Sequence, residues 1–261
     1  MSTHTGRWPA GTPCWTDLST PDVTAAVAFY RGVVPAWTYS PPNEASGGYV
    51  LAQVDGRSAA GLGPQFGGAP VGWTLYLAVD DADATQEAVV RLGGSVLLPA
   101  GDVGDFGRMA VIADPAGAAV GLWQAGTHEG IGFTGEPGCL AWEDLRSTDP
   151  EASRAFYAEL FGFQYSPVPG AGDDYRVFAL PDAPEHPLGG MGGLMGEQDV
   201  PSHWLVYFGV ADVAASVASA TAGGGTVQVP PRESPYGVMA GLVDPAGAGF
   251  WLHQPSPDAA S

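Results

Sequence analysis

Apolar and polar positions alternate in short runs along the chain, and segments with helical spacing separate these runs. The alternation over residues 13–19 predicts a strand. Apolar residues three and four positions apart then predict a helix over residues 21–33. Thr20 is expected to cap this helix, and Pro21 suits its first turn. The chain therefore opens with a strand that leads directly into an amphipathic helix.

The same pattern predicts further elements up to residue 124. A short strand is expected near residues 49–54, and the glycine- and proline-rich stretch 61–72 is expected to be irregular. The remaining predicted elements are a strand from residue 73, a helix over 83–92, and strands near 95–98, 108–113 and 118–124.

The second half of the chain repeats the first half. Residues 15–30 and 142–157 are identical at half of their positions when they are aligned 127 residues apart. The Asp-Pro-Ala-Gly sequence at 114–117 recurs at 244–247 and predicts a tight turn before the last strand of each copy. The predicted organisation is a tail (1–10), a first domain (11–126), a linker (127–137), a second domain (138–255) and a tail (256–261).

Each copy contains the order β-α-β-β-β twice. We therefore expect an α+β fold with mainly antiparallel sheets and helices on one face. In the second copy, Asp149 is expected to cap the helix that begins at Pro150, and Gly162 is expected to end it.

These motifs resemble those of the vicinal oxygen chelate superfamily of glyoxalases, bleomycin-resistance proteins and extradiol dioxygenases. The resemblance rests on Asp22 with Phe29-Tyr30, on Asp149 with Phe156-Tyr157, and on the two Asp-Pro-Ala-Gly turns. It implies two tandem glyoxalase-like domains, each a cupped sheet with helices on its outer face and a ligand inside the cup. The tandem form resembles proteins labelled as hydroxylases or accessory proteins of aromatic antibiotic pathways.

The resemblance also implies where a metal would be bound. Enzymes of the family place His or Gln on the first strand, His on the fifth and Glu on the eighth. The corresponding positions here are Trp15, Thr74, Gly121, Trp142, Leu205 and Trp251. Since none of these residues is a His or Glu ligand, we expect no metal and no cofactor. An alternative site that uses His203 and His253 with Glu143 or Asp144 stays open.

Strand alternation predicts which side chains line the two cups. The expected ligand-binding residues are Trp15, Thr74, Trp123, Trp142, His203, Leu205, Trp251 and His253. The expected catalytic residues are Asp17, Asp144, Tyr76 and Tyr207. If Trp15 instead faced the helices, Trp73 and Trp204 would line the cups.

Composition narrows the chemistry. The chain has nine basic residues, all arginine, against 28 acidic ones, which gives a net charge of −19. The absence of lysine excludes Schiff-base catalysis, and the negative charge argues against nucleic acid and favours cationic ligands. Cys14 and Cys139 are expected to be small buried residues. We expect a cytoplasmic protein without a membrane segment that is a monomer or a weak dimer.

Four functions remain open. The first is a metal-free protein of natural-product biosynthesis or resistance that binds a planar aromatic, polyketide-like molecule, cationic or neutral, by stacking on indole and phenol rings. The second is a metal-independent isomerase, cyclase or accessory hydroxylase in which an Asp in the cup acts as acid and base. The third is a metal-dependent lyase or dioxygenase with atypical ligands, and the fourth is an interaction protein whose cups bind no ligand.

Overall fold

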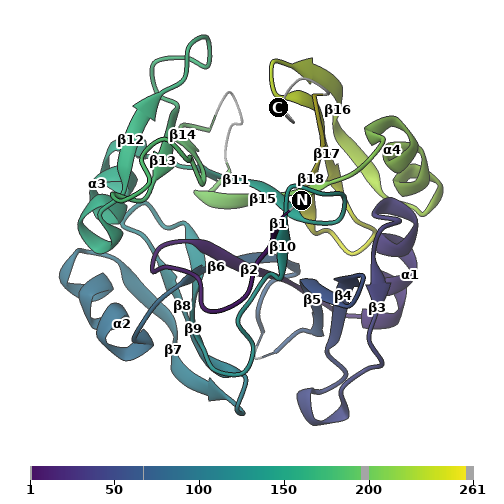
Figure 1. Cartoon of the computed structure of the whole chain (residues 1–261), viewed down its shortest axis with the longest axis horizontal. Coiled ribbons are helices and arrows are strands. Elements are labelled where there is room, and N and C mark those ends of the chain that lie inside the picture. The colour runs from purple at the N-terminus through teal and green to yellow at the C-terminus, as the bar shows by residue number, and fades with distance from the viewer. Residues whose placement is uncertain (1, 67, 195–199, 257–261) are drawn as a thin grey trace.

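The chain folds into two domains, each built on one curved sheet of eight strands (Figure 1). The computed structural model describes residues 2–66, 68–194 and 200–256. The strands of the first domain are β2 (Pro13–Thr20), β3 (Thr38–Tyr39), β4 (Val50–Val54), β5 (Arg57–Pro64), β6 (Gly72–Ala78), β7 (Ser95–Val103), β8 (Gly107–Ala113) and β9 (Ala119–Ala125). Their order in the sheet is β3-β4-β5-β2-β6-β9-β8-β7.

The second sheet repeats this topology. Its strands are β11 (Leu140–Arg146), β12 (Gln164–Pro167), β13 (Arg176–Ala179), β14 (Gly189–Gly192), β15 (His203–Gly209), β16 (Thr226–Ser234), β17 (Gly237–Val243) and β18 (Gly249–Pro255). Their order is β12-β13-β14-β11-β15-β18-β17-β16. In each sheet two pairs are parallel, and the other neighbours are antiparallel. The predicted α+β class and the tandem repeat of one sheet topology are confirmed.

Four α-helices and a short 3₁₀ turn accompany the sheets in the described residues. They are α1 (Val23–Val33), α2 (Ala82–Arg91), α3 (Pro150–Phe161), α4 (Val213–Ala222) and η1 (Glu44–Ser46). None of the helices in the described ranges is long and apolar enough to cross a bilayer.

The helix boundaries follow capping chemistry, with one correction. Asp149 accepts from the Ala152 amide, and Gly162 ends α3 with φ 76°, both as predicted. Thr20 does not cap α1, because the strand continues through it and the Asp22 side chain accepts from the Ala25 amide instead. An aspartate caps all four of these helices, because its carboxylate satisfies an amide that has no partner within the helix.

The glycine- and proline-rich stretch 61–72 begins inside a strand that the sequence did not predict. β5 runs through residues 57–64, and β14, residues 189–192, is the equivalent strand of the second copy. Glycine weakens strand propensity, but here neighbouring rings lie against the glycine backbone and require its missing side chain. The irregular prediction was therefore wrong for residues 61–64.

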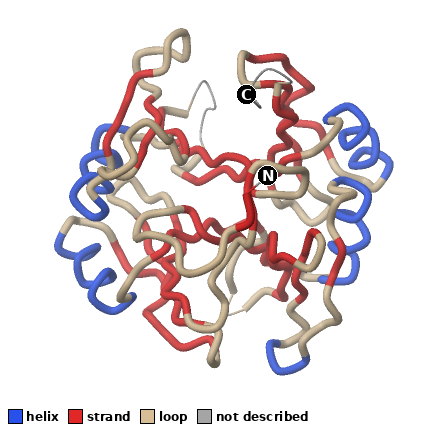
Figure 2. Tube along the Cα trace, viewed as in Figure 1, coloured by secondary structure: helices blue, strands red, loops and turns tan. Residues whose placement is uncertain are grey.

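The two domains pack back to back, with helices on both flanks (Figure 2). Strand β6 contacts β15 in the centre, while α1 packs on α4 and α2 on α3. The repeated Phe-Tyr motif lies in this interface: Phe29 contacts Phe250, and the Tyr30 hydroxyl donates to Asp244 Oδ2 at 3.2 Å. The Phe-Tyr motif of the first domain and the Asp-Pro-Ala-Gly turn of the second therefore contact each other across the domain interface.

Residues 126–134, which include much of the predicted linker, cross one end of the first sheet; we call this segment the strap. The His128 amide donates to a carbonyl of the turn between β7 and β8, the Ile131 amide to one of β2 and the Gly132 amide to one of β5. The N-terminal residues lie on it, since β1 (Ser2–Thr3) pairs with β10 (Phe133–Thr134). The strap therefore closes one end of the first sheet's concave face.

Candidate functional site

The side chains expected in the cups lie on the face opposite the helices. Trp73 Nε1 donates to the Tyr30 hydroxyl at 2.9 Å and Trp204 Nε1 to the Tyr157 hydroxyl at 3.2 Å, so these two indoles face the helices. Trp15 lies on the other face and donates to Tyr49. The arrangement with Trp73 and Trp204 in the cups is therefore wrong.

The first cup is centred on Asp17. Its carboxylate accepts from the hydroxyls of Tyr49 and Tyr76, each at 3.2 Å, and the Tyr49 hydroxyl accepts from Trp15 Nε1 at 3.1 Å. Burial raises the pKa of Asp17 to about 7, although both tyrosine donors oppose this shift. Asp17 and Thr74 are opposite each other in the β2–β6 ladder, and both are half-buried.

Glycines form the floor on which the tyrosine rings lie. A Cβ at Gly121 would be 2.1 Å from the Tyr76 ring, and a Cβ at Gly61 or Gly63 would overlap the Tyr49 ring. Both phenols are therefore held flat against the sheet, with their hydroxyls directed at Asp17. Tyr49 was missed from the sequence; it aligns with Tyr175, which has the equivalent role in the second cup.

His128 closes the first cup from the strap. Its ring packs edge-on against the rings of Trp15 and Trp123, with centroid separations of 4.3 Å and 5.7 Å. Its backbone carbonyl accepts from Trp123 Nε1 at 3.0 Å. Burial lowers the pKa of the His128 imidazole to about 4, so the ring is neutral at pH 7. Trp15 and Trp123, both expected to contact ligand, are thereby buried.

The second cup is centred on Asp144, which four donors saturate. Oδ1 accepts from the Tyr175 hydroxyl at 2.7 Å and from Trp142 Nε1 at 3.1 Å. Oδ2 accepts from the Tyr207 hydroxyl and from Arg146 Nη2, both at 2.8 Å. A carboxylate offers about four lone-pair positions, and all four are used here.

Arg146 is the main residue of the second cup that sequence reasoning missed. It is buried beside Asp144, and although burial opposes its charge, the carboxylate holds the pKa of Arg146 above its usual range. The equivalent position in the first copy is Ser19. Comparing the two aligned strands residue by residue would have shown this difference between the cups.

The other expected residues of the second cup lie on the same face. Leu205 is opposite Asp144, and Trp251 is opposite Tyr207, with the two rings 5.2 Å apart. His203 and His253 follow the same alternation. Unlike the indoles of the first cup, Trp142 and Trp251 are only half-buried.

The residues do not fit a metal centre of the family's kind. No group of three His, Cys, Asp or Glu side chains comes together anywhere in the ranges that the structure describes. The alternative with His203 and His253 has no support either, because neither side chain belongs to a group of three candidate ligands in the described residues. One ring nitrogen of each bonds to a backbone carbonyl, His203 Nδ1 to that of Pro201 at 2.8 Å and His253 Nε2 to that of Tyr236 at 3.0 Å. Glu143 alternates to the opposite face of the strand.

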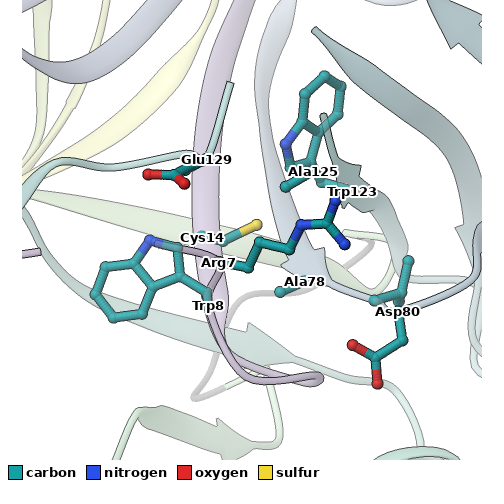
Figure 3. A pocket seen from close by; sticks show the side chains of 9 residues that line it. Arg7, Trp8, Cys14, Ala78, Asp80, Trp123, Ala125 and Glu129 are labelled. Carbon is teal, nitrogen blue, oxygen red and sulfur yellow. The ribbon is translucent and has the colours of Figure 1, made fainter. Parts of the chain in front are cut away.

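A small pocket lies outside the strap and is not part of either cup (Figure 3). The Arg7 side chain extends toward Ala125 and Trp123, between Glu129 and Asp80. The pocket has a volume of about 10 Å³, which accommodates one water molecule at most. Cys14 borders it, but burial raises the pKa of this thiol, so Cys14 is the inert core residue that was expected.

Comparison with known proteins places both domains in one family. The model of the glyoxalase/bleomycin resistance protein/dioxygenase superfamily matches residues 139–252, and a glyoxalase-like domain model matches residues 15–122. CFP32 of Mycobacterium bovis, provisionally named a glyoxylase, is 42% identical over 95% of this chain and 96% of its own. The anthracycline biosynthesis protein DnrV of Streptomyces peucetius is 37% identical over 94% and 93%.

Solved structures share the fold. The Mn(II)-bound glyoxalase of Novosphingobium aromaticivorans superposes with a TM-score of 0.62 at 16% identity and covers 95% of this chain and 89% of its own. The 2,3-dioxygenase LapB of Pseudomonas sp. KL28 gives 0.62 at 16% identity over 97% and 96%. The chain therefore belongs to the glyoxalase/bleomycin resistance protein/dioxygenase superfamily, in its tandem two-domain form.

Proposed function

We propose that the chain binds a planar aromatic small molecule in its second cup, by stacking and without a bound metal. The observation that carries this proposal is the pair of half-buried indoles, Trp142 and Trp251, at positions where metal-using relatives carry ligands. Tyr207 lies beside Trp251, and the Asp144 carboxylate holds the Tyr207 hydroxyl in place. Rigid rings of this kind provide contact area with little loss of side-chain entropy.

Two further points support binding in this cup. The saturated Asp144 has no lone pair left to take a proton, so its role is to orient Tyr175, Tyr207 and Arg146. The second point is the similarity to proteins named for anthracycline biosynthesis, a class of compound with a planar aromatic core.

Titration with quinizarin, a planar hydroxyanthraquinone, tests the proposal through quenching of tryptophan fluorescence. We expect Trp251→Leu to weaken binding about tenfold, because a stacking contact is worth about 0.5–1.5 kcal/mol beyond its buried area. Trp8→Leu is the matched control, since Trp8 stacks on His4 away from both cups and its loss should leave the affinity unchanged. Absence of quenching by quinizarin and by larger polycyclic quinones would contradict the proposal, as would about one transition metal per purified chain.

The second candidate is a metal-independent enzyme that uses Asp17. Asp17 is half-buried, no salt bridge to it occurs among the described residues, and its pKa of about 7 suits proton transfer at neutral pH. If Asp17→Asn stops conversion of a bound polyketide but leaves its affinity intact, this candidate is favoured. Turnover that survives the substitution removes it.

A further inference from the structure

The two cups have the same architecture, but the central carboxylate of each has different charged neighbours. In the second cup, Arg146 neutralises Asp144 at 2.8 Å. In the first cup, Ser19 takes the place of Arg146, and the described part of the chain gives Asp17 hydrogen bonds from Tyr49 and Tyr76 but no ion pair. The carboxylate of the first cup therefore has no counter-ion among the residues that the structure describes.

Other polar atoms of the first cup also have no partner. Five buried side-chain nitrogen or oxygen atoms in the described ranges make no hydrogen bond, and two of them, Ser19 Oγ and His128 Nε2, belong to this cup. The others lie at the start of β2, on β3 and in the turn after β8. Buried polar atoms in native proteins nearly always bond to protein or to ordered water, so these two atoms mark where a water or a ligand would bond in this cup.

The side chains that line the first cup indicate which kind of ligand would bind there. The Asp17 carboxylate, the Ser19 hydroxyl and the neutral His128 imidazole can all accept a hydrogen bond. The rings of Tyr49 and Tyr76 flank the carboxylate, and ring faces attract cations. The two arginines on strands of the first sheet pair with other carboxylates, Arg57 with Glu136 and Arg108 with Asp83 and Asp102.

We propose that the first cup is a binding site for an organic ammonium ion, with Asp17 as its counter-ion. The ammonium group donates to Asp17 and Ser19, and the strap with His128 forms the closed end of the site. This site is separate from the stacking site of the second cup, so the proposal does not depend on the function proposed above. The net charge of −19 favours the approach of a cation.

Isothermal titration with 2-phenylethylamine and its neutral analogue 2-phenylethanol tests the proposal. We expect the amine to bind at least ten times more tightly than the alcohol. Asp17→Asn should remove this preference, and Ser19→Arg should abolish amine binding by supplying the cation that the second cup contains. Ser19→Ala removes one acceptor of the ammonium group and should weaken amine binding. Asp182→Asn, which removes an exposed carboxylate outside both cups, is the matched control and should leave amine binding unchanged.

A measurement on the unmodified protein covers the case in which the variants do not fold. Amine affinity should fall as the pH drops below about 7, because the amine competes with a proton for Asp17. Tyr49 and Tyr76, which face Asp17, have pKa values raised well above 10, and His128 titrates near 4, so none of them mimics this effect. Equal binding of amine and alcohol, or an amine affinity that Asp17→Asn leaves unchanged, would overturn the proposal.

Discussion

At the scale of single residues, the cups depend on carboxylates whose partners differ. Asp17 and Asp144 occupy equivalent positions and both accept from two tyrosines, but only Asp144 has an arginine. Two differences separate them: Arg146 stands where the first cup has Ser19, and Trp142 donates to Asp144 whereas Trp15 donates to Tyr49. Asp17 therefore accepts from two side chains and Asp144 from four. The duplicated domains thus place equivalent carboxylates in different electrostatic surroundings.

The free energy of unfolding should report the burial of Asp17 directly. Its pKa is raised from 3.8 to about 7, so the folded state resists ionisation and stability falls as the pH rises from about 4 to 7. Asp17→Asn cannot ionise, so it should gain stability relative to the natural chain over this range, by about 1.4 kcal/mol for each unit of pKa shift. Urea denaturation at pH 4 and pH 8 measures the change, and an equal difference between the two proteins at both values would contradict it.

At the scale of elements, glycine-rich strands hold aromatic rings in fixed positions. β5, β9 and β14 contain glycines whose backbone lies against the rings of Tyr49, Tyr76 and Tyr175. A bare backbone lets a ring lie flat on the sheet, where any Cβ would push it away. The strands are thus specified by packing against neighbouring rings rather than by their own propensity.

Gly121→Ala should therefore destabilise the first domain and displace the Tyr76 ring. A Cβ at this position would lie 2.1 Å from that ring, and overpacking of this kind costs about 1–3 kcal/mol. Gly72→Ala, in the same sheet, is the matched control, because nothing lies within 4 Å of its Cβ. Thermal unfolding of both variants gives the comparison, and similar losses at the two positions would show that ring contact is not the reason.

At the scale of the whole molecule, the repeated motifs join the domains. Tyr30 accepts from Trp73 of its own domain and donates to Asp244 of the other, while Tyr157 accepts from Trp204. The interface is therefore a shared core, lined with aromatic residues from both sheets. Neither sheet buries its helix-facing side alone.

Tyr30→Phe should be more destabilising than Tyr157→Phe. The first change leaves both Trp73 Nε1 and Asp244 Oδ2 without that hydroxyl, and an unpaired buried group costs about 1–3 kcal/mol. The second removes only the acceptor of Trp204, since the Asp114 Oδ2 atom that faces this region makes no hydrogen bond. Guanidinium denaturation of both variants tests the order, which would be wrong if Tyr157→Phe lost as much stability.

The sequence by itself determined the duplication, the order of the predicted elements and the face of each predicted strand, whereas β5 was missed. These features are local: an exact period of two decides which residues share a face, and identical motifs in both halves decide the repeat. They were enough to place Trp15, Asp17, Trp142 and Asp144 in the cups. The cap of α1 was misassigned because Thr20 and Asp22 are both good capping residues. The structure decides between them, since β2 continues through Thr20 and Asp22 is the residue that precedes the helix.

Only the tertiary structure decided what each cup contacts. His128 reaches the first cup because the strap crosses its end, and no pattern near residue 128 indicates that path. Tyr49 and Tyr175 lie just before β4 and β13, which are two strands away from β2 and β11 in the sheets. Their hydroxyls reach Asp17 and Asp144 across the strand in between. Hydrogen bonds and burial depend on residues far apart in sequence, so the closed first cup and the saturated Asp144 follow from the folded packing alone.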